Sequence, residues 1–344
     1  MTHTTRIKLL KNSCRIFFLI LTALLPISSN GQECGSRTLD PEIAGFLKII
    51  GYQDLSLEQL RAMPIGQLKF PQIPLLPYPK EDVQRIKVTR DSIPVLVFNP
   101  LHKDNLPVII QYHGGGFISP LVPGLEYSLW QDARNYEAVV FAVDYRVAPE
   151  HRFPAAVDDS YASFLWISEN AQRFGGDVNK IVLMGNSAGA NLVAAITQRA
   201  KKAGIGNRIK LQVLNGLPAD LRPQHMESSE SYLQNASGYF QTKALCYFAV
   251  ETYAPEQYND PEVSPILAAD FSGLPPALIV TAEFDPMRDD GPLYAAKLSA
   301  AGVKVREKCF AGQLHCLIGA LPESKAQHEF VTLVKNAMSD HLSK

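Results

Sequence analysis

A serine stands in this chain inside a short sequence that suits nucleophilic chemistry. Ser187 is the centre of a Gly-x-Ser-x-Gly sequence at 185–189, which follows an apolar run at 181–184 and precedes a helix-forming stretch. A strand, this turn and a helix form a nucleophile elbow, which lifts the serine hydroxyl clear of a sheet. Glycine on both sides lets the backbone turn tightly. The pattern predicts Ser187 as a nucleophile.

A serine at its ordinary pKa is a weak nucleophile, so it needs a base, and the base needs an acid to orient it. Asp285 follows an apolar run at 277–281, and His315 follows the next one at 303–310. The order serine, acid, histidine is one in which such triads occur on parallel sheets. Asp285 is favoured as the acid because it lies just past a strand end. Alternative acids near it are Glu283, Asp289 and Asp290.

Three consecutive glycines follow His113, directly behind an apolar run at 108–112. Bare backbone N–H groups are what a developing oxyanion needs, so the glycine tripeptide predicts an oxyanion hole. We expect His113 to hold this loop by a hydrogen bond rather than to act as a base. The glycines are Gly114, Gly115 and Gly116.

The elements that position these residues follow from alternating apolar runs and helical segments. Strands and helices in alternation predict a mostly parallel sheet with helices on both faces. The first two strands are joined too closely for a crossover and must be antiparallel. The expected strands are 85–90, 93–99, 108–112, 139–143, 181–185, 210–214, 277–281 and 303–309, and the expected helices are 155–173, 188–203, 291–302 and 323–338.

Two segments interrupt this alternation, at 38–80 and at 217–270. Neither has a place in the sheet, so we expect them to form a cap over its carboxyl edge, where open α/β sheets bind ligands. The insertion at 217–270 is rich in aromatic residues, most of which we expect to form its own small core. The predicted organisation is a cap segment at 38–80 and a catalytic domain at 81–344 that carries the insertion.

Taken together, the ordered motifs resemble the hormone-sensitive-lipase family of α/β-hydrolases, from about residue 85 to the end. The resemblance implies an α/β-hydrolase fold with an eight-stranded sheet, a helical cap and ester hydrolysis without a cofactor. It implies a triad of Ser187, Asp285 and His315, with the Ala188 amide joining the oxyanion donors. The motifs are 113–117 (HGGGF), 144–151 (DYRVAPEH), 185–189 (GNSAG), 274–277 (LPPA), 285–289 (DPMRD) and His315.

Two positions depart from the family pattern. Asn186 stands where the family usually has aspartate, and Cys316-Leu317 stands where it usually has Gly-Phe. Neither change removes a triad atom. Both alter the packing beside Ser187 and His315, so they bear on rate and chain-length preference rather than on reaction type.

The overall composition limits the classes of partner that the chain is expected to bind. The chain has 344 residues and a formal net charge of -1, so it has no basic excess with which to bind nucleic acid. No clustered Cys/His spacing is present in the sequence, and no metal site is expected. We expect a small-molecule ester as the substrate, and the oligomeric state stays open. Asn235 begins an Asn-Ala-Ser sequence that a glycosylating host would recognise.

The amino terminus reads as an export signal. Basic residues precede a short apolar run at 16–27, and small residues follow at Ser29 and Gly31. The run is too short to span the ~30 Å hydrocarbon core of a bilayer stably. We expect 1–31 to be a cleaved signal peptide and the mature chain to be secreted or periplasmic. The alternatives are an uncleaved interfacial anchor and lipid attachment through Cys34.

Four cysteines would remain after cleavage, and they allow three pairings. Buried unpaired thiols are an equally open interpretation. The four are Cys34, Cys246, Cys309 and Cys316.

The leading functional hypothesis is a carboxylic-ester hydrolase for short- to medium-chain acyl esters. An amidase or peptidase would use the same triad, as would a polysaccharide acetyl esterase. The alternative from another class is a ligand-binding protein on the same fold. Plant gibberellin receptors are of that kind and lack the catalytic histidine, whereas His315 is present here.

Overall fold

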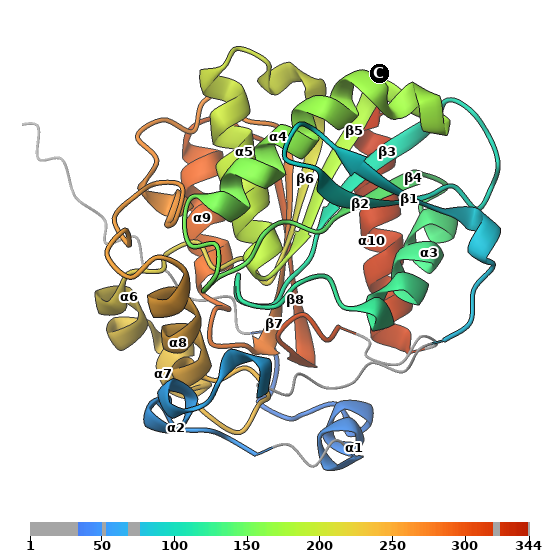
Figure 1. Ribbon diagram of the computed structural model, residues 1–344. Coiled ribbons are helices and arrows are strands. Elements are labelled where there is room, and N and C mark those ends of the chain that lie inside the picture. Colours follow the sequence, from blue (N-terminus) through green and yellow to red (C-terminus); the bar gives the residue numbers. More distant parts are fainter. Residues whose placement is uncertain (1–33, 50–52, 68–75, 319–323, 343–344) are drawn as a thin grey trace, which may run out of the picture. The chain divides into compact units, whose positions relative to one another are not determined.

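The computed structural model describes residues 34–49, 53–67, 76–318 and 324–342. Its centre is one eight-stranded sheet in the order β1-β2-β4-β3-β5-β6-β7-β8 (Figure 1). Only β2 runs against its neighbours, and every other pairing is parallel. The strands are β1 Val83–Val88, β2 Ile93–Phe98, β3 Leu106–Tyr112, β4 Val139–Val143, β5 Gly176–Asn186, β6 Ile209–Asn215, β7 Ala277–Phe284 and β8 Val305–Leu314.

Helices cover both faces of the sheet. Alternate side chains of each strand enter two separate cores, because successive residues of a strand point to opposite faces. Ile110 packs in the core that holds α4, α5 and α9, whereas Ile109 packs in the core that holds α3 and α10. These helices are α3 Glu126–Asn135, α4 Ala155–Asn170, α5 Ala188–Lys202, α9 Asp290–Ala300 and α10 Lys325–Leu342.

The eight strands and the mostly parallel sheet predicted from the sequence are confirmed, as is the antiparallel pairing of β1 with β2. Two differences stand out. Helix α3 was not expected, because its sequence is mostly polar and only three of its side chains are buried. Strand β8 continues to Leu314, past a left-handed glycine at Gly312, so it delivers His315 directly at its end.

The segments outside the alternation contain short helices. Helix α1 is Pro41–Ile49 and α2 is Leu57–Ala62, while the insertion holds α6 Pro223–Ser228, α7 Glu230–Gln234 and α8 Lys243–Tyr253. Helix α2 packs against α8, where Arg61 and Glu251 form an ion pair of 2.6 Å. The Gly238 amide also donates to Asp54 Oδ2 at 2.8 Å. The two segments therefore contact each other (Figure 1).

A disulfide joins Cys34 to Cys309 of β8, with 5.5 Å between their Cα atoms, and Cys246 and Cys316 are free thiols. Of the four cysteines, two thus form a disulfide and two are unpaired thiols, so each of the two open interpretations holds for one pair of residues. Beside the disulfide, the Arg37 amide donates to Glu283 Oε1 at 2.6 Å. Together these contacts fasten the start of the described chain to β7 and β8.

The predicted signal peptide at 1–31 lies outside the described residues. Among the helices of the described ranges, none has the length and apolar character needed to cross a membrane.

Candidate active site

The Ser187 turn has the strained backbone expected of an elbow. Ser187 adopts φ 54° and ψ −122°, in the left-handed half of conformational space. Its amide donates to the Asn215 carbonyl at the end of β6, at 2.8 Å. A Cβ at Gly185 would collide with the Gly189 backbone, and one at Gly189 would collide with the Tyr112 carbonyl. The helix N-terminus can pack this close to β3 and β5 only because both positions are glycine.

His315 lies between Ser187 and Asp285. Its Nε2 is 2.8 Å from Ser187 Oγ, and its Nδ1 is 2.7 Å from Asp285 Oδ2. The histidine is 4% exposed and the aspartate 0%. The structure thus brings together three side chains whose sequence positions are far apart, in one continuous chain of hydrogen bonds.

The loop that carries Asp285 begins where β7 ends. Asp285 Oδ1 accepts from the Met287 amide at 2.8 Å, and its carbonyl accepts from Asn235 Nδ2 at 2.9 Å. Asn235 is 0% exposed. A glycan cannot be attached to a buried amide that holds this loop, so the interpretation of Asn235 as a glycosylation acceptor is wrong for the folded chain.

The other three candidate acids bond to groups other than His315. Glu283 accepts from the Arg37 and Gly312 amides, Asp289 accepts from the Ser231 amide, and Asp290 pairs with His225. Asp285 is the carboxylate within hydrogen-bond distance of His315 among these four.

Two opposing effects act on the pKa of His315. Burial lowers it, but the negative charge of Asp285 raises it, as do contacts with Cys316 and the Asp285 hydrogen bond. The pKa of His315 is raised well above its ordinary value as a result. The ring is therefore a strong base, because its charged form is stabilised by the carboxylate behind it.

The glycine loop after His113 lies beside the nucleophile. A Cβ at Gly114 would be 3.3 Å from Ser187 Cβ, and Gly115 and Gly116 both have positive φ. Among the described residues, neither of those two amides donates to a protein acceptor, and neither does the amide of Ala188. Unoccupied backbone donors next to a serine hydroxyl are what an oxyanion requires.

His113 holds this loop, as expected. Its Nδ1 is 2.7 Å from the Gly114 carbonyl, and its ring stacks on Tyr145 with centroids 4.1 Å apart. Burial lowers the pKa of His113. A neutral ring whose Nδ1–H donates to that carbonyl fixes the loop.

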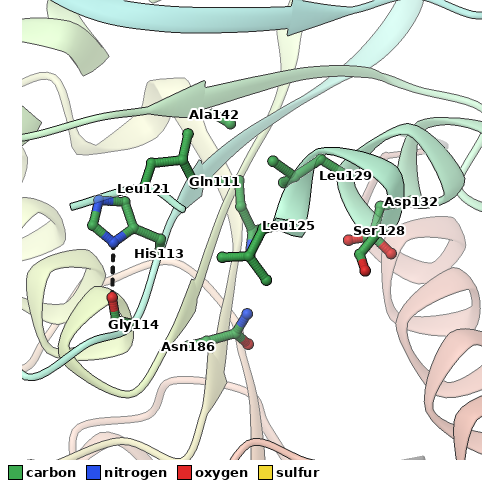
Figure 2. A pocket seen from close by; sticks show the side chains of 10 residues that line it. All are labelled: Gln111, His113, Gly114, Leu121, Leu125, Ser128, Leu129, Asp132, Ala142 and Asn186. Atoms are coloured by element: carbon green, nitrogen blue, oxygen red, sulfur yellow. Dashed lines mark hydrogen bonds between the residues drawn. The ribbon is translucent and has the colours of Figure 1, made fainter. Parts of the chain in front are cut away.

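A small cavity of about 70 Å³ lies behind the glycine loop, between α3 and the ends of β3 and β5. The side chains of Gln111 and Asn186 point toward each other across it (Figure 2). Asn186 Oδ1 accepts from Asn215 Nδ2 at 3.0 Å, which places the Asn186 amide nitrogen on the cavity side. Burial raises the pKa of Asp132, which also lines the cavity, to about 7. The volume suits a few water molecules.

Sequence reasoning missed three residues that organise the site. Asn215 is the last residue of β6, Gly216 follows it, and Asn235 lies in the insertion. Asn215 acts through its backbone carbonyl, Gly216 through the space that its missing side chain leaves, and Asn235 through its side-chain amide. No local sequence motif marks such roles. Among the described residues, no group of three or more His, Cys, Asp or Glu side chains is placed to hold a metal ion.

Comparison with known proteins places this geometry in a family. A family profile described as the α/β-hydrolase fold matches residues 109–319. The arylesterase of Saccharolobus solfataricus is 31% identical over 292 residues, which are 82% of this chain and 93% of that protein. The chain belongs to the hormone-sensitive-lipase-like α/β-hydrolases. It is an esterase of the carboxylesterase type.

Further relatives agree with this assignment. Carboxylesterase NlhH of Mycobacterium tuberculosis is 40% identical over 222 residues, 62% of this chain and 67% of that protein. The solved structure of an esterase from Pyrobaculum calidifontis has a TM-score of 0.74 and 31% identity, and the match covers 88% of this chain and 98% of that one.

Proposed function

We propose that this hormone-sensitive-lipase-like esterase hydrolyses short- to medium-chain acyl esters through a Ser187–His315–Asp285 triad and an acyl-enzyme. The observation that carries the proposal is the unbroken hydrogen-bond chain from Ser187 Oγ through both nitrogens of His315 to Asp285 Oδ2. A small-molecule ester is the expected substrate.

In the proposed reaction, Ser187 Oγ attacks the ester carbonyl while His315 Nε2 takes its proton. The carbonyl oxygen becomes an oxyanion, which the amides of Gly115, Gly116 and Ala188 stabilise. His315 then gives the proton to the leaving alcohol. Water attacks the acyl-enzyme by the same route, with His315 again as the base, and releases the acid.

The preference for shorter chains rests on the cap. A Cβ at Gly116 would lie 2.9 Å from Ala249 Cβ of α8, so the insertion reaches the oxyanion loop. A pocket closed on that side has limited depth, and each methylene gains about 0.8 kcal/mol only until the pocket is full. Among the aromatic residues of the insertion, Tyr239 and Phe240 are half-buried, whereas Tyr232 is fully buried in the main core that also holds α4, α5 and α9. The expectation that the insertion's aromatic residues form a small core of their own is therefore wrong.

The test of chain-length preference is kcat/KM along p-nitrophenyl esters from acetate to palmitate. We expect an optimum between about two and eight carbons. Replacing Ala249 by leucine should move the optimum to shorter chains, and the matched change of the exposed cap residue Leu233 to alanine should leave it in place. A wild-type optimum at palmitate would overturn the proposal.

The same triad can cleave amides or acetylated sugars, so the reaction class needs its own test. A panel of p-nitrophenyl acyl esters, aryl amides and acetylated sugars separates the three. We expect the acyl esters to be the best substrates. Turnover of aryl amides at a comparable rate would favour an amidase, and no turnover of any compound would favour a ligand-binding role.

We also propose that the mature chain is secreted or periplasmic after cleavage near residue 31. The Cys34–Cys309 disulfide supports this proposal, because such bonds form and persist outside reducing compartments. Intact-protein mass spectrometry of the exported protein should give a mature chain that begins near Gln32. A chain that keeps Met1, or a lipidated Cys34, would contradict it.

A further inference from the structure

One backbone carbonyl connects two parts of the active site that are remote in sequence. The Asn215 carbonyl accepts from the Ser187 amide at 2.8 Å and from Cys316 Sγ at 3.4 Å. The Asn215 side chain also donates to Asn186 Oδ1 at 3.0 Å. Asn215, at the end of β6, is thus bonded to the nucleophile turn after β5 and to the histidine loop after β8.

The Cys316 thiol also contacts the histidine itself. Its sulfur lies 3.6 Å from His315 Nε2, the atom that faces Ser187 Oγ. Cys316 has φ 53°, in the left-handed region. This conformation costs a residue with a side chain about 1–3 kcal/mol and persists only where the surrounding structure holds it. Strain at a residue that touches the base calls for a functional explanation.

The neighbouring glycine makes room for this arrangement. Gly216 has φ 60°, and a Cβ there would lie 2.7 Å from Cys316 Sγ and 2.8 Å from His315 Cε1. The space that a side chain at Gly216 would take is therefore filled by the thiol and the imidazole edge. The ring is packed against sulfur rather than against solvent.

The hydrogen bond that the Cys316 thiol donates determines whether its sulfur can accept another one. When S–H donates to the Asn215 carbonyl, the sulfur lone pairs are free to accept from another donor. After Ser187 gives up its proton, His315 Nε2 carries an N–H that must stay in place until the leaving alcohol takes it. A sulfur 3.6 Å away is a weak second acceptor for that N–H.

We propose that Asn215 and Cys316 form a positioning junction that holds His315 Nε2 in line with Ser187 Oγ throughout proton transfer. The inference rests on the triad proposed above. The ionisable groups that act on the ring are Asp285, from the loop after β7, and Cys316, from its own loop. Both favour the charged imidazole, Asp285 through its negative charge and the neutral Cys316 sulfur as a hydrogen-bond acceptor, so loss of the sulfur should lower the pKa of His315.

The experiment compares kcat/KM against pH for wild type, Cys316→Ala and Cys316→Ser, with p-nitrophenyl butyrate. The alanine variant should lose about five- to tenfold in kcat, as expected for one weak hydrogen bond, with little change in KM. Its acid limb should move to lower pH. The serine variant keeps a donor and an acceptor, so it should recover most of the rate and shift the limb back.

The other free thiol provides the matched control. Cys246 is buried in α8, where its sulfur accepts from Gln241 Nε2 at 3.3 Å and does not contact His315, so Cys246→Ala should leave the acid limb where it is in wild type. Asn215→Ala removes the side-chain bond to Asn186 but keeps the carbonyl, so it should cost less in kcat than Cys316→Ala. Thermal melting of each variant separates loss of folding from loss of positioning.

A Cys316→Ala profile that superimposes on wild type would overturn the junction, and so would an equal loss at every pH with no movement of the limb. Failure of the triad itself looks different. In that case, Ser187→Ala would leave kcat unchanged, both alone and in combination with Cys316→Ala.

Discussion

Ser187 shows how a single residue combines local strain with distant support. Its left-handed backbone is held by glycines on either side and by the Asn215 carbonyl, 28 positions along the chain. The glycines are visible in the sequence as a motif. The carbonyl is not, because any residue type supplies one and only the fold brings it there.

The positions of the proposed triad residues and of His113 in the fold could be predicted for a related reason. Each lies next to an apolar run, so its place at a strand end follows from the run. Asn235 has no such neighbour. Its bond to the Asp285 carbonyl crosses between the insertion and the β7 loop, and the same Asn-Ala-Ser letters suggested a surface glycan instead. Buried amides that bond to backbone leave no pattern to detect.

The pH dependence of kcat/KM tests His315 as the base. The pKa of His315 is raised, and the base works only when neutral, so activity should rise with pH along a limb above the ordinary histidine value of about 6.5. Asp285→Asn removes the charge that raises this pKa, so the limb should move to lower pH while kcat falls about 10⁴-fold. An unshifted limb in that variant would contradict the assignment.

Gly216 tests how tightly the ring is packed. Gly216→Ala places a methyl group within 3 Å of His315 Cε1 and Cys316 Sγ and forces a left-handed alanine. Misplacement of the ring by about 1 Å should cost on the order of 100-fold in kcat. Gly238→Ala is the control, because that glycine also has positive φ but has open space around it. Equal effects of the two changes would mean that backbone strain alone is responsible.

At the scale of elements, the sheet was easier to predict than what covers it. Strands such as β4 and β7 are fully buried, so they appear as unbroken apolar runs. Helix α3 buries only Glu126, Leu129 and Ala133, which is too sparse a pattern to detect. The short helices α6 and α7 are fixed by contacts with α9 and its loop rather than by their own periodicity.

One such contact fastens α6 to α9. His225 Nε2 lies 2.7 Å from Asp290 Oδ1, in a cluster that also contains Asp220 and Arg222. Burial lowers the pKa of His225 and Arg222 opposes its charge, but the hydrogen bond and charge of Asp290, with Asp220, leave this pKa raised. A raised histidine pKa stabilises the fold below about pH 6.5, and this contribution is lost as the pH rises through the folded-state value.

The corresponding measurement is the free energy of unfolding of wild type and His225→Gln at about pH 6 and about pH 9. The difference between them should be about 1 kcal/mol larger at the lower pH. The matched control is His151→Gln, an exposed histidine in the loop after β4. A difference for His225→Gln that is the same at both pH values would show that the ion pair does not contribute.

At the scale of the whole chain, the alternation of strands and helices predicted one sheet covered on two sides, and this is what the fold contains. The pairing of Cys34 with Cys309 was beyond sequence reasoning, because it depends on where the segment before α1 meets β8. The bond closes a loop across most of the chain, with a sequence separation of 275.

Removing this bond should be costly. Replacing both Cys34 and Cys309 by serine should lower the free energy of unfolding by about 2–5 kcal/mol, because the unfolded chain regains the freedom that the cross-link removes. Denaturant unfolding of the double variant against wild type provides the value, with Cys246→Ser as a control that breaks no cross-link. An unchanged midpoint and slope would mean that the disulfide does not stabilise the fold.

The most direct test of the account is the ester-hydrolysis rate of purified Ser187→Ala. The substitution removes one hydroxyl from a turn and should leave the fold intact, which circular dichroism checks. We predict a loss of about 10⁴- to 10⁶-fold in kcat, because attack, acyl-enzyme and proton transfer all depend on that oxygen. A folded Ser187→Ala protein that hydrolyses p-nitrophenyl butyrate at the wild-type rate would contradict the central claim.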